Sequence, residues 1–214
     1  MAEFGVGAIH TLRGDHAEAI GPLERGLVIT NASAFPLTFP FIAAPLGLAY
    51  VILGRQADGL RLLEEAVQSA ESMELMANHT LRLVWLGQAH VAAGDGEAAG
   101  RFGRRALDVA RRYKERGHEA YALRLLGDLA LSSSPPDAVQ AREHYGQALE
   151  LAESLGMRPL SAHCHLGLAR TEGAIQDRDG EPHAERATAL YQELGMTAWV
   201  QRAEEAPTSL PEPR

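Results

Sequence analysis

The stretch LGLAR at residues 166–170 decides the fold, because the chain repeats it at a constant interval. Four counterparts lie upstream, each with glycine in second place: VGAIH at 6–10, LGLAY at 46–50, LGQAH at 86–90 and LGDLA at 126–130. Successive glycines are 40 residues apart. A fixed interval of this length is typical of repeat proteins, in which each unit stacks on its neighbours.

Each unit reads as a helix, a tight turn and a second helix. Small residues follow the glycine at two fixed distances: Ala19, Gly59, Ala99 and Ala141, then Gly26, Ala66, Ala106 and Ala148. A break rich in turn residues separates the two halves of a unit, at 13–15, 54–56, 93–96 and 132–137. Small residues at matching positions would let the two helices of a hairpin approach closely. Leucines beside the glycines would fill the remaining space.

The ends of the helices carry their own signals. Asp15, Asp95 and Asp137 stand where a carboxylate can cap the next helix. Gly117, Gly156 and Gly195 are expected to close the second helices in the later units, because glycine tolerates the left-handed closing residue. Apolar residues spaced as Leu60, Leu63 and Val67 support helices, and alternating strand patterns are absent.

We therefore predict an all-α fold, a right-handed α-solenoid of about five helical hairpins within residues 1–206. The expected units lie near 1–34, 35–75, 76–116, 117–156 and 157–195, with a capping helix at 197–206 and a disordered tail at 207–214.

Composition narrows the class of protein. The 214 residues carry a net charge of −8, so nothing global attracts nucleic acid or an anionic membrane. The single cysteine fits a reducing, cytoplasmic setting, and the first residues lack the pattern of a signal peptide. The most apolar run, 35–54, contains three prolines and is interpreted as a buried helix. An arginine-rich run at 101–116 is interpreted as a solvated helix face, with contact to an acidic partner as the alternative.

The pattern resembles the tetratricopeptide repeat (TPR), whose hairpin has Leu-Gly and an aromatic residue in its first helix and alanines in its second. Leu46, Gly47, Tyr50 and Ala66 match best, although the period exceeds the usual 34 residues. PLGLAYVILGR at 45–55 and LAESLGMRPLSAHCHLGLAR at 151–170 resemble the C-terminal repeat region of bacterial adenylate/guanylate cyclase–AAA ATPase signalling proteins. Some relatives of that group carry a LuxR-type DNA-binding domain instead.

No catalytic residue, cofactor site or metal site is predicted. The sequence has no phosphate-binding P-loop, G-x-S-x-G, H-E-x-x-H or C-x-x-C motif. His163, Cys164 and His165 are adjacent, but successive helix residues are about 100° apart, so one helix cannot aim both histidines at one metal. His163 is expected to face the second helix of its hairpin, and His165 a neighbouring unit. A metal site would need His183 or another distant ligand.

By the 40-residue register, one side of the first helices is expected to form a concave groove. Its expected residues are apolar toward one end and mixed toward the other: Phe41, Leu48, Leu81, Val84, Gln88, Tyr121, Arg124, Asp128, Cys164 and Leu168. An extended peptide or a partner helix could bind there.

The expected function is a non-catalytic protein–protein interaction module. The resemblance implies the sensor or scaffold repeats of a larger bacterial signalling ATPase or cyclase, with a catalytic domain N-terminal to Met1. A free-standing TPR adaptor that binds a peptide in the groove is the first alternative. A metal-dependent enzyme that uses the segment 163–165 is the second.

Overall fold

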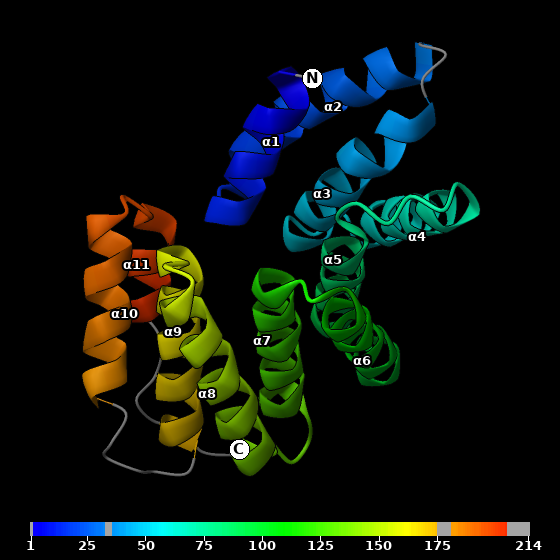
Figure 1. The fold of residues 1–214 in the computed structure, drawn as a ribbon. Helices are drawn as coiled ribbons and strands as arrows, with labels where there is room; N and C mark the ends of the chain where they lie inside the picture. The colour runs from blue at the N-terminus through cyan, green and yellow to red at the C-terminus, as the bar shows by residue number, and fades with distance from the viewer. Residues whose placement is uncertain (1, 33–35, 175–180, 205–214) are drawn as a thin grey trace. The chain divides into compact units, whose positions relative to one another are not determined.

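A computed structural model describes residues 2–32, 36–174 and 181–204. Within these ranges every regular element is a helix, and no strand occurs (Figure 1). The chain divides into two compact units, Met1–Ala106 and Leu107–Arg214, and each unit is described by itself.

The N-terminal unit is a run of antiparallel helices. Its elements are α1 (Ala2–Arg13), α2 (His16–Ala32), the 3-10 helix η1 (Pro36–Thr38), α3 (Phe39–Ile52), α4 (Gln56–Ser72) and α5 (His79–Ala92), followed by α6 (Gly96–Tyr113), which extends beyond residue 106. Each helix from α1 to α5 packs on the next, and the first helices of successive hairpins also touch, α1 on α3 and α3 on α5.

The C-terminal unit continues the pattern. Its complete helices are α7 (Arg116–Ser132), α8 (Ala138–Ser154), α9 (Arg158–Ala174), α10 (Glu181–Glu193) and α11 (Thr197–Glu204). They pack in chain order, and α7 also touches α9 (Figure 1). The predicted capping helix at 197–206 matches α11 as far as residue 204, whereas its last two residues and the predicted tail lie outside the described residues.

In the first two hairpins, the repeated glycine makes room for one side chain of the second helix. A Cβ atom at Gly7 would lie 2.4 Å from Cγ of Leu23, and one at Gly47 would lie 2.8 Å from Cγ of Leu63. Leu23 and Leu63 are fully buried and stand 40 residues apart. The glycine therefore sets how closely the helices approach, as the register argument predicts.

Most predicted helix ends are confirmed. The Asp95 and Asp137 carboxylates accept hydrogen bonds from the backbone N–H groups of Ala98 (3.0 Å) and Gln140 (2.9 Å). Gly156 and Gly195 have left-handed φ values after α8 and α10.

The prediction for Gly117 is wrong. This glycine lies in the first turn of α7, and Lys114, with φ of 57°, takes the left-handed position instead. A residue other than glycine thus takes the left-handed conformation in this turn, at a conformational cost.

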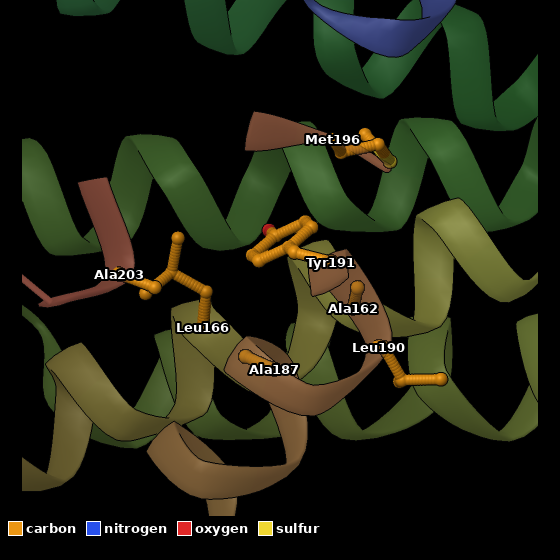
Figure 2. Packing of buried hydrophobic residues seen from close by; sticks show 7 residues of the cluster. All are labelled: Ala162, Leu166, Ala187, Leu190, Tyr191, Met196 and Ala203. Atoms are coloured by element: carbon orange, nitrogen blue, oxygen red, sulfur yellow. The ribbon is translucent and has the colours of Figure 1, made fainter. Parts of the chain in front are cut away.

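One core cluster of the C-terminal unit lies where α9, α10 and α11 meet, together with the segment leading into α11. Figure 2 shows the seven buried residues gathered there: Ala162, Leu166, Ala187, Leu190, Tyr191, Met196 and Ala203. In the N-terminal unit, the apolar run predicted as a buried helix forms α3, in which every residue from Ile42 to Val51 is buried. No described helix is long and apolar enough to cross a membrane.

Candidate functional site

Tyr145 of α8 is held between two of the repeated glycines. A Cβ atom at Gly127 of α7 would lie 2.9 Å from Cδ1 of the ring, and one at Gly167 of α9 would lie 2.4 Å from Cε1. The side chain is only 2% exposed. Three helices therefore meet around one aromatic ring, and the bare glycine backbones supply the space for it.

The Tyr145 hydroxyl of α8 contacts a cluster of polar side chains on α7. It donates a hydrogen bond of 2.7 Å to Oδ1 of Asp128. The other oxygen, Oδ2, lies 3.2 Å from Nη1 of Arg124, one helical turn earlier. Tyr121 stands a further three residues back, so Tyr121, Arg124 and Asp128 share one face of α7. These three side chains are half-buried.

Arg124 keeps its charge in this setting. Burial alone would lower the pKa of its guanidinium, but Asp128 and weaker neighbours raise the pKa above its ordinary value. Burial and Asp128 together raise the pKa of Tyr145, so its hydroxyl remains a donor. The side chain of Arg124 is 15% exposed, and within the described part of the chain its Nε atom has no hydrogen-bond partner. Because Nε is itself buried, only the exposed part of the side chain can meet a further acceptor.

Cys164 of α9 interacts electrostatically with the charge of Arg124, but it does not line an open surface. Its side chain is 0% exposed, and burial raises the pKa of the thiol to about 12. Because the thiolate is the reactive form of cysteine, this thiol is inert in the folded chain. The expectation that Cys164 faces an open groove is corrected by its burial.

Burial reduces the number of predicted groove residues that a partner could contact. Five of its residues are buried: Leu48, Leu81, Val84, Cys164 and Leu168. The other five are half-buried: Phe41, Gln88, Tyr121, Arg124 and Asp128. Arg124 and Asp128 form an ion pair on α7 and Tyr121 shares their helix face, whereas Phe41 and Gln88 belong to the N-terminal unit. Partner binding by any of them stays a prediction.

The adjacent histidines have separate surroundings, as the helix geometry predicts. His163 shares a hydrogen bond of 2.7 Å between its Nδ1 and Oη of Tyr191, on the second helix of the same hairpin. Its ring also stacks edge-on against Trp199, with centroids 4.3 Å apart. Burial, with nearby arginines, lowers the pKa of His163 well below its ordinary value, so the ring is neutral.

His165 does more than face a neighbouring unit. Its Nε2 lies 3.8 Å from Glu153 on α8 of the preceding hairpin, in line with that expectation. Its Nδ1, however, lies 2.7 Å from Nδ1 of His183 on α10 of its own hairpin. No group of three or more His, Cys, Asp or Glu side chains that could hold a metal ion occurs in the described ranges.

The sequence analysis did not predict that two polar residues, Tyr145 and Arg82, would be buried in the interior. One is Tyr145, which takes the place of Leu23 and Leu63 once the insertion before α8 is counted. The other is Arg82, only 1% exposed, at a position held by Ile42, Ala122 and Ala162 in other units. Alignment of the units at 40 residues, with a two-residue insertion allowed before α8, would have revealed both exceptions.

Arg82 is buried without a carboxylate among its recorded contacts. Its Nη2 donates a 2.7 Å hydrogen bond to the carbonyl of Leu75, and its guanidinium lies 5.4 Å from the ring centre of Phe41. Nε and Nη1 have no hydrogen-bond partner among the residues described. Burial lowers the pKa of Arg82 to about 10, so it remains charged at neutral pH.

No protein-family model matches the chain, and neither does any curated protein. Solved structures are similar to it in fold. BtubC from P. vanneervenii has a TM-score of 0.64 at 17% identity, covering 97% of this chain and 81% of that one. TPR-like repeats of a Podosopora anserina kinesin light chain protein have a TM-score of 0.59 at 16% identity, covering 90% and 95%. A single-substitution variant of these repeats gives 0.61 at 16%, with 91% and 95% covered.

At such identities the similarity concerns the fold alone. It confirms the prediction of an all-α solenoid of TPR-like hairpins. The relation to cyclase and ATPase proteins stays a prediction.

Proposed function

We propose that this chain is a protein–protein interaction module that binds a segment of a partner protein on the α7 face of its C-terminal unit. Within that proposal, it serves as the sensor or scaffold region of a larger bacterial signalling ATPase or cyclase, and it performs no catalysis itself. The fold supports the general part, because stacked helical hairpins present long surfaces of the kind used for partner binding.

The observation that carries the proposal is the state of Arg124. Its guanidinium is held by Asp128 at 3.2 Å and stays charged, and 15% of the side chain remains exposed. A carbonyl or carboxylate oxygen of a partner would accept a hydrogen bond from the exposed part of this guanidinium. A charge-assisted hydrogen bond of this kind contributes about 1.5–3 kcal/mol.

Neighbouring side chains fit the same role. Tyr121 supplies a half-buried aromatic ring beside Arg124 on α7. Aromatic and arginine side chains that are largely buried before binding lose little conformational freedom when a partner arrives. We therefore expect the partner segment to place an apolar side chain on Tyr121 and an acceptor at Arg124.

Selection from a peptide library displayed on phage tests the proposal. The immobilised full chain is compared with Arg124→Gln and with Arg112→Gln, which removes an exposed arginine of α6. We expect enriched peptides to bind the parent chain and the Arg112 variant alike, and the Arg124 variant at least about tenfold more weakly. Failure to enrich any peptide, or equal affinity for both variants, would refute the proposed surface.

The coding region upstream of Met1 separates the two possible arrangements. A nucleotide-binding domain in the same reading frame would support the signalling ATPase or cyclase. A stop codon there, together with peptide capture by the chain alone, would support the free-standing adaptor.

A further inference from the structure

The first hairpin exposes apolar side chains at positions of the repeat that the next two units bury. In α1, Val6 is 46% exposed and Ile9 is 58% exposed. Their counterparts at 40-residue intervals are at most 1% exposed: Leu46 and Ala49 in α3, and Leu86 and Ala89 in α5. The same side of the first helix is therefore open in the first unit and closed in the two units that follow it.

Contacts within the N-terminal unit show what closes this side in α3 and α5. One turn after the buried leucine of α3, the Tyr50 hydroxyl donates a hydrogen bond of 2.6 Å to Oε1 of Glu24 on α2. One turn before the buried leucine of α5, the guanidinium of Arg82 lies 5.4 Å from the ring centre of Phe41 on α3. Both contacts reach back to the preceding hairpin. This side of a first helix is therefore the surface on which a neighbouring hairpin stacks.

The second helix of the first hairpin extends the open surface. Glu24 marks the side of α2 that α3 covers, and five residues of helix correspond to a rotation of about 140°. Ile29 therefore points away from α3, and it is 61% exposed. We call Val6, Ile9 and Ile29 the N-terminal face.

The charges at the edge of the N-terminal face allow it to meet a copy of itself. Arg13 lies two helical turns after Val6, and Glu18 lies three turns before Ile29, so both follow the same side of the hairpin. Both side chains are exposed, and their charges are opposite. Two such faces brought together therefore gain attraction at their edges as well as burial of apolar surface.

The last described helix offers no matching apolar surface. Trp199 and Val200 of α11 pack against the core cluster of the C-terminal unit. The exposed residues of this helix are polar: Thr197, Gln201, Arg202 and Glu204. Terminal units of repeat arrays normally carry such a polar outer surface. Head-to-tail stacking of two copies would therefore place the N-terminal face of one against a polar helix of the other.

We infer that two copies of this chain associate through their N-terminal faces. In this arrangement each face buries its apolar side chains against the same side chains of the second copy, and a two-fold axis closes the assembly at a dimer. Only three large apolar side chains per copy form the centre of the contact, so the dissociation constant should be about micromolar or weaker. The inference goes beyond the proposed binding face on α7 and does not depend on it.

Sedimentation equilibrium of the full chain, from about 1 to about 500 μM, tests the association. We expect a monomer–dimer equilibrium that Ile9→Glu weakens at least about tenfold, because the two-fold axis brings the introduced charges of both copies close together. Val139→Glu, which replaces an 82% exposed residue of α8, is the matched control and should leave the equilibrium unchanged. Since Ile9 is exposed in the single chain, its substitution should also leave the urea midpoint unchanged.

Chemical crosslinking locates the contact without relying on a loss of binding. Ile9→Cys, treated with a short bismaleimide, should give a covalent dimer, whereas Val139→Cys should give little, and the native Cys164 thiol is fully buried. A monomer over the whole concentration range would overturn the inference and leave the N-terminal face to a helix of another protein. A dimer of equal strength in Ile9→Glu, or equal crosslinking of the two cysteine variants, would overturn it as well.

Discussion

The close approach of the α3 and α4 backbones predicts what Gly59→Ala does to the N-terminal unit. A Cβ atom at Gly59 of α4 would lie 2.4 Å from the carbonyl oxygen of Gly47 on α3, and 2.5 Å from Cγ2 of Val51. The carbonyl belongs to the backbone of a helix buried along most of its length. Relief of the clash therefore requires the two helices to move apart by about 1 Å to reach ordinary contact.

Two opposing terms set the size of the effect. Alanine in place of glycine inside a helix stabilises it by about 1 kcal/mol. An overpacked core substitution costs about 1–3 kcal/mol, and contact with an immobile backbone places this one near the upper end. The net expectation is that Gly59→Ala lowers the free energy of unfolding by about 2 kcal/mol.

Urea unfolding followed by tryptophan fluorescence measures the change in stability of the N-terminal unit. Trp85 lies in the N-terminal unit and Trp199 in the other, so a Trp199→Phe background leaves Trp85 as the reporter. Gly5→Ala is the matched control, because no atom lies within 4 Å of a Cβ built on this helical glycine. We expect the control to lose no stability. An unfolding midpoint for Gly59→Ala at or above that of Gly5→Ala would refute the role of the repeated small residues.

Three further perturbations follow from the interior contacts. Tyr145→Phe keeps the ring between its glycines but removes the donor to Asp128, so urea unfolding should show a loss of about 1.5–3 kcal/mol. Arg82→Met removes a buried cation that contacts no carboxylate among the described residues. The free energy of unfolding should increase by roughly 1 kcal/mol, seen as a higher thermal midpoint, and a lower midpoint would contradict this expectation. The Cys164 thiol, with its pKa raised to about 12 by burial, should react with Ellman's reagent at pH 8 only after urea is added. Since the unfolded thiol ionises near pH 9 and the folded one does not, its contribution to stability is complete below that pH and falls from pH 9 to 12.

The helical hairpins could be predicted because their causes are local or periodic. A glycine recurs every 40 residues, and the close approach of Gly7 to Leu23 and of Gly47 to Leu63 shows the reason in the first two hairpins. The caps at Asp95 and Asp137 depend on backbone groups only three residues away. The closing residue Lys114 could not be foreseen in the same way, because glycine is the usual but not the necessary choice there.

The candidate site was predicted only in part. Register placed Tyr121, Arg124 and Asp128 on one helix face, and the structure keeps them together. Register could not show that Cys164 is buried, because burial depends on the size of every side chain packed above it.

The sequence by itself determined the repeat period, the helix type and the different directions in which His163, Cys164 and His165 leave their helix. Tertiary structure alone decided which residues meet: Tyr145 with two glycines from flanking helices, and His165 with His183. The physical reason is that helix periodicity determines angles along one element. Contact between particular side chains of two helices also depends on the axial offset left by the connecting segment, which the repeat spacing does not encode.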